Sequence, residues 1–172
     1  MSDPKINEAL DMGHGVFHIQ VIRDGKNGPE VIAERRVANM VLPGGKKELL
    51  RRAMNVSTVG EFTTSGIRYF DQMRIGTSGI TNSTAFTNVR SPVTGTLNTV
   101  DTKSLLAGTR TMQLVISYPS CASSKHATGI AEVAILCKNT SPGGTALARG
   151  IFAAVNKTIV DKLKITYSCR IT

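Results

Sequence analysis

The chain has 172 residues, of which 41% are hydrophobic and only 5% aromatic, with no tryptophan. This length is enough for one domain with a real core, and no apolar run is long enough for a membrane-spanning helix. The net charge of +9 indicates an acidic partner, although a solvated surface explains the same excess equally well. The first residues lack the apolar segment of a secretory signal, so we expect the chain to act where it is made.

An N-terminal arm and a hairpin come first. Residues 1–14 carry the apolar side chains Ile6 and Leu10 and lead into glycines, so we expect a flexible arm that can lie along a neighbouring molecule. Residues 16–37 predict a hairpin, because apolar and polar residues alternate before a glycine-rich turn at 24–29. The charges on the returning strand favour an edge position in a sheet.

A short helix is predicted over residues 46–54, after the break Pro43-Gly44-Gly45. The stretch lacks the spacing of a phosphate-binding loop, so we exclude nucleotide binding there. The helix holds the densest positive cluster of the sequence, which offers a surface for an acidic partner or is simply a solvated helix face. Its members are Lys46, Lys47, Arg51 and Arg52.

The middle of the chain predicts extended structure. A strand is expected over residues 69–75, followed by a long polar surface loop that begins at Gly76. Residues 86–104 predict extended chain interrupted by a proline and a glycine. Residues 111–118 alternate apolar and polar side chains, which is typical of a strand with one buried face.

The last part of the chain is the most regular. Runs at 130–139, 145–155 and 163–172 predict three strands, and the Ser-Pro-Gly-Gly turn within 140–144 separates the first two. In the last run alternate residues share one buried face. These residues are Leu163, Ile165, Tyr167, Cys169 and Ile171.

Seven or eight predicted strands and one short helix, without regular alternation of strands and helices, indicate a mainly β protein. We expect an antiparallel β-sandwich with jelly-roll-like connections. Neither a repeat nor a linker is present, so residues 15–172 are expected to form a single domain behind the arm. The strand phases predict a common set of core residues, namely Leu114, Ile116, Ile135, Phe152, Ile165 and Tyr167.

Several short motifs, taken in order, resemble the small structural proteins of tailed-bacteriophage virions, a family often labelled tail, baseplate or capsid-accessory protein. The resemblance spans roughly two thirds of the chain and implies a structural role, with no catalytic residues. It rests on N-M-V-L-P-G-G-K-K-E-L-L (39–50), M-R-I-G-T-S-G-I-T-N-S-T-A-F (73–86), Glu132 within an apolar strand, A-R-G-x-F (148–152), N-K-T (156–158) and D-x-L-x-I-T-Y (161–167).

No catalytic, cofactor or metal site is predicted. The histidines are scattered, and Cys121, Cys137 and Cys169 do not have the spacing of zinc ligands. We expect Cys137 and Cys169 to be buried thiols, since the chain shows no export signal. The serine of the G-T-S-G stretch has no recognisable base near it in the sequence.

The leading functional hypothesis is a non-enzymatic capsid decoration or cement protein, assembled into the virion in the host cytoplasm. Its partners would be other virion proteins, such as the major capsid protein or tail and collar proteins. A homo-oligomer is expected, and a trimer if the protein sits on a head lattice. A tail, collar or baseplate subunit, including a receptor-binding one, is the alternative. We do not expect a membrane partner, and nucleic acid is disfavoured because the basic cluster at 46–52 contains no aromatic residue for base stacking. Expected contact residues are Ile6, Leu10, Lys46, Lys47, Arg51 and Arg52.

Overall fold

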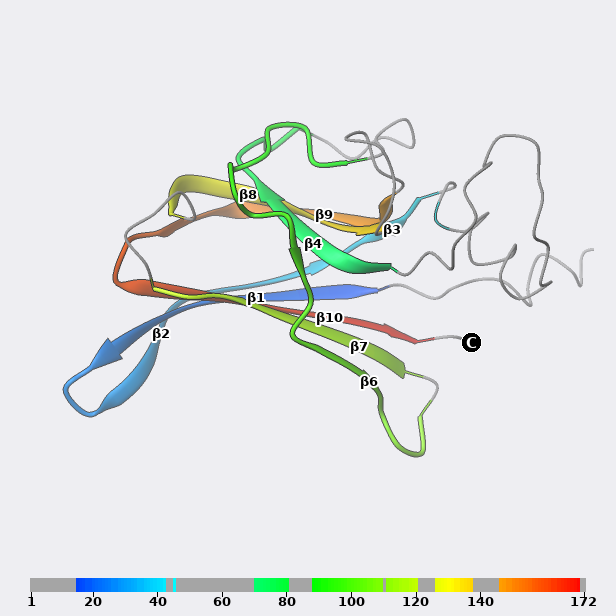
Figure 1. Cartoon of the computed structure of the whole chain (residues 1–172), viewed down its shortest axis with the longest axis horizontal. Coiled ribbons are helices and arrows are strands. Elements are labelled where there is room, and N and C mark those ends of the chain that lie inside the picture. Colours follow the sequence, from blue (N-terminus) through cyan, green and yellow to red (C-terminus); the bar gives the residue numbers. More distant parts are fainter. Residues whose placement is uncertain are drawn as a thin grey trace, which may run out of the picture.

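The structure, a computed structural model, describes residues 15–42, 45, 70–80, 88–109, 111–120, 126–137 and 146–170. These residues form two five-stranded antiparallel sheets that pack face to face (Figure 1), so the predicted β-sandwich is confirmed. The strands are β1 (Val16–Gly25), β2 (Gly28–Ala38), β3 (Met40–Val41), β4 (Phe70–Gly76), β5 (Asn98–Thr99), β6 (Thr102–Leu105), β7 (Thr111–Tyr118), β8 (Ala127–Cys137), β9 (Ala146–Lys157) and β10 (Asp161–Arg170).

The first sheet, here called sheet A, has the strand order β2-β1-β10-β7-β6. The predicted hairpin is present as β1 and β2, and β2 lies at the sheet edge as its charges indicated. The last strand of the chain, β10, is inserted between β1 and β7 and pairs antiparallel with both. The sheet is therefore completed only when β10 is in place.

The second sheet, sheet B, has the order β3-β9-β8-β4-β5. Its central strand β8 is buried on both faces, because every side chain from Ile130 to Cys137 is inaccessible. One face points into the sandwich. The other face is covered by chain that follows β4, and this double burial explains why the strand reads as a nearly continuous apolar run.

The main core lies between the sheets and contains all six residues predicted from strand phase: Leu114, Ile116, Ile135, Phe152, Ile165 and Tyr167. Phe17 fills the centre and stacks against Tyr167 with ring centroids 4.8 Å apart. Gly150 in sheet B makes room for this ring, because a Cβ there would come 2.6 Å from Phe17 Cδ2. The expected buried thiols Cys137 and Cys169 are also in place.

Both sides of the sandwich are closed by chain that passes from one sheet to the other. On one side β2 leads through Asn39 into β3, and the Asn39 amide donates to the Gly15 carbonyl at 2.9 Å. On the other side β5 leads directly into β6, where Lys103 reaches across to Asp71 with an Nζ–Oδ2 distance of 3.0 Å. The connections β7–β8 and β9–β10 also join strands of different sheets.

Several predicted features fall outside the described residues, namely the arm 1–14, the predicted helix 46–54, Cys121 and the turn 140–144. The described residue Gly45 packs on β9 so closely that a Cβ would come 2.6 Å from the Leu147 Cα atom. Among the residues that the structure describes, no helix is long and apolar enough to cross a membrane.

Candidate functional site

A buried ion pair lies on the outer side of sheet B. Glu132 on β8 and Arg149 on β9 both have 0% exposure. The register places Ala134 opposite Arg149, so Glu132 is the diagonal neighbour of the arginine on the same face. Arg149 Nε and Nη2 donate to Glu132 Oε2 at 3.1 and 2.5 Å. Two charges that each interrupt an apolar strand thus neutralise one another.

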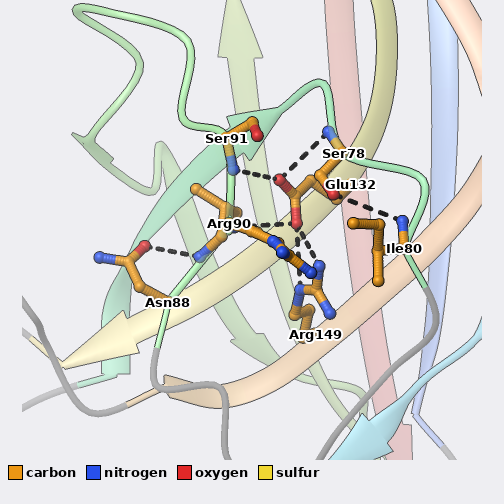
Figure 2. A network of polar contacts seen from close by, with 8 residues as sticks. Ser78, Ile80, Asn88, Arg90, Ser91, Glu132 and Arg149 are labelled. Atoms are coloured by element: carbon orange, nitrogen blue, oxygen red, sulfur yellow. Dashed lines mark hydrogen bonds and ion pairs between the residues drawn. The ribbon is translucent and has the colours of Figure 1, made fainter.

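Three backbone amides complete the environment of the carboxylate (Figure 2). The amides of Ser78 and Ser91 donate to Glu132 Oε1 at 3.3 and 2.9 Å, and the Arg90 amide donates to Oε2 at 3.1 Å. These amides belong to the chain that follows β4. We call its described parts, residues 77–80 and 88–96, the strap.

The strap covers a second, smaller apolar cluster. The Thr77 amide donates to the Ser91 carbonyl at 2.9 Å and joins the two parts of the strap, and the Val93 amide donates to Ile75 in β4 at 3.0 Å. A surface loop was expected to begin at Gly76, but Ser78 in this stretch is buried. Its amide donates to the Glu132 carboxylate. The strap thereby shields the outer face of sheet B from water. The cluster comprises Leu42, Val89, Ala134, Leu136 and Ala146.

The chemistry open to this network is limited by its geometry. Five donors point at the two oxygens of Glu132, and both charged side chains are inaccessible to solvent. A carboxylate so surrounded can neither abstract a proton from a substrate nor bind an exposed ligand. It does cross-link β8, β9 and the strap, and removing one partner of such a buried pair costs about 3–5 kcal/mol.

A second polar contact fixes the turn between β9 and β10. Asp161 is buried, accepts from the amide and hydroxyl of Thr158 at 2.9 and 2.6 Å, and accepts from Arg23 Nε at 2.8 Å. Burial alone would raise the pKa of Asp161, but the hydrogen bonds from Arg23 and Thr158 outweigh it and lower this pKa to about 2. The carboxylate joins the last turn to the first strand of sheet A.

The six residues expected to contact a partner all lie outside the described residues. They are Ile6, Leu10, Lys46, Lys47, Arg51 and Arg52. Within the ranges that are described, no group of three or more His, Cys, Asp or Glu side chains is arranged to hold a metal ion.

Sequence reasoning singled out Glu132 but missed its role as the centre of a network. The available signal was a second lone charge, Arg149, in an equally apolar strand, since unpaired charges are almost never fully buried. The strap amides could not be identified from the sequence, because every residue except proline has a backbone N–H group.

The motifs that carry the phage resemblance converge on these contacts. Gly76 and Ser78 belong to the segment 73–86, Arg149 to A-R-G-x-F, and Thr158 and Asp161 to the last two motifs. No protein-family model, no curated protein and no solved structure matches the chain.

Proposed function

We propose that the chain is a non-enzymatic structural component of a bacteriophage virion, most specifically a capsid decoration protein that stabilises the particle through protein–protein contacts. The proposal rests on the ordered motifs that resemble virion proteins. A β-sandwich is compatible with this role but serves many others, so the fold alone does not select it.

One structural observation supports the proposal above the rest. Three charged residues of the resembling motifs, Glu132, Arg149 and Asp161, are buried and hold strands and turns together. The motifs therefore encode a rigid framework rather than a reactive site. Rigidity of this kind suits a subunit whose task is to hold its neighbours in a fixed arrangement.

The proposed partners are the major capsid protein and further copies of this chain, with a trimer as the expected oligomer on a head lattice. A tail, collar or baseplate subunit, with or without receptor binding, is the alternative within the same class. The two differ in number, because a decorated head carries many more copies than a tail.

The experiment is quantitative staining or mass spectrometry of gradient-purified particles, with the chain measured against the major shell protein. Copy numbers comparable to the shell protein support decoration, and a small fraction of that number supports the tail alternative. Absence of the chain from particles that are complete and infectious would contradict the whole proposal. If the chain is a cement protein, particles assembled without it should be less heat-resistant than particles that contain it.

A further inference from the structure

Five hydrogen-bond donors from separate parts of the chain converge on one position outside sheet B. They are the amides of Ser78, Arg90 and Ser91 and the Nε and Nη2 groups of Arg149. We infer that these groups form a carboxylate-binding receptor, and that the side chain of Glu132 is the ligand that the chain itself supplies.

The amides are held in place by contacts that do not involve Glu132. Thr77 N–H donates to the Ser91 carbonyl at 2.9 Å, and Val93 N–H donates to Ile75 at 3.0 Å. Pro92 forms an isolated bridge with Gly76. Because these contacts join the two parts of the strap to each other and to β4, its N–H groups are oriented before a carboxylate arrives, as in other preorganised anion sites.

The receptor also contains a buried positive charge, and Gly76 leaves space for a carboxylate beside it. Arg149 is fully buried, so its guanidinium requires an anion beside it. Gly76 forms the floor, since a Cβ there would come 2.4 Å from Glu132 Oε1 and 2.8 Å from Glu132 Cγ. The carboxylate of Glu132 therefore lies directly against the Gly76 backbone, where a Cβ would collide with it.

The test replaces the internal ligand by an external one. Glu132→Ala removes the same atoms that acetate contains, and the probe is sodium acetate against sodium chloride at equal ionic strength and pH 7. Acetate at ten times its dissociation constant should raise the folding equilibrium constant of this variant about tenfold, by linkage. The wild-type protein should show no acetate-specific change, because its receptor is already filled.

Two further variants separate specific binding from a general salt effect. In Glu132→Gln the side chain still occupies the receptor, so acetate should not stabilise this variant. Glu132→Ala combined with Arg149→Met lacks the buried cation, so acetate should again have no effect beyond that of chloride. An equal response of all three variants to acetate would overturn the inference.

The inference remains testable if Glu132→Ala does not fold in chloride. The protein is then refolded from urea in acetate and in chloride, and native strand signal is measured by circular dichroism. Recovery in acetate alone supports a preformed receptor. Failure to recover in either salt contradicts it, because a receptor assembled by the strap's own contacts should accept the missing fragment.

Discussion

The carboxylate of Glu132 occupies the space where a side chain at Gly76 would lie. A Cβ at position 76 would come 2.4 Å from Glu132 Oε1 and 2.6 Å from the Ser91 carbonyl oxygen. The glycine is therefore required by the close approach of β8 and the strap, and a methyl group would push the two apart.

Gly76→Ala should destabilise the protein by about 1–3 kcal/mol, as overpacking typically does. Gly79→Ala is the matched control, because a Cβ at the neighbouring exposed glycine would meet nothing within 4 Å, and its effect should stay within about 0.5 kcal/mol. Urea unfolding of both variants measures the difference. Equal stability of the two would show that the carboxylate does not sit above Gly76.

Glu132 and Arg149 should be strongly coupled in a double-mutant cycle. Glu132→Gln or Arg149→Met alone leaves a buried charge without its counter-ion, and each should cost about 3–5 kcal/mol. The double variant should lose clearly less than the sum, since it leaves neither charge behind. Additive losses, measured by chemical denaturation, would mean that the two side chains do not form a pair in solution.

Two buried tyrosines provide a matched pair for hydrogen bonding. The Tyr118 hydroxyl lies 2.9 Å from the Thr96 carbonyl oxygen and 3.2 Å from that of Met73, whereas the Tyr167 hydroxyl lies beside the side chains of Asn39 and Cys169 without a hydrogen bond of ordinary geometry. Tyr118→Phe should cost about 1 kcal/mol. Tyr167→Phe should be neutral or slightly stabilising, because it removes a buried polar group that gains nothing in return. A lower thermal midpoint for Tyr167→Phe than for Tyr118→Phe would refute this assignment of the hydrogen bonds.

Asp161 should contribute to the loss of folding stability at acidic pH. Its pKa is lowered from 3.8 to about 2 in the folded protein, so its stabilising effect is fully present above about pH 4 and is lost as the pH falls towards 2. Asp161→Asn should remove this contribution and flatten the profile in that window. Asp24→Asn, which changes an exposed carboxylate beside Lys162, is the control and should keep the wild-type shape.

Several strands could be predicted from the sequence because only one of their faces is buried. Residues 111–118 alternate regularly and form β7 over the same range. The stretch 86–104 was harder, since it contains only the short strands β5 and β6. These strands are defined by their neighbours in the two sheets rather than by a periodic pattern of their own.

The polar network could not be predicted, for a different reason. Glu132 and Arg149 are 17 residues apart, and their contact depends on a β8–β9 register that is interrupted by several irregularities. A shift of one residue would turn one of them to the opposite face. The insertion of β10 between β1 and β7 was equally hidden, because alternation identifies a strand but not its partner.

Amide hydrogen exchange tests most directly, residue by residue, whether Glu132 accepts the hydrogen bonds of the strap. The amides of Ser78, Arg90 and Ser91 should be strongly protected in the wild-type protein. In Glu132→Ala these three amides lose their acceptor and should exchange faster, while the amides of Thr77 and Val93, which donate to backbone carbonyls, and of Ile165 in β10 stay protected. Exchange of the three strap amides at the rate of unstructured chain in the wild-type protein would contradict the account.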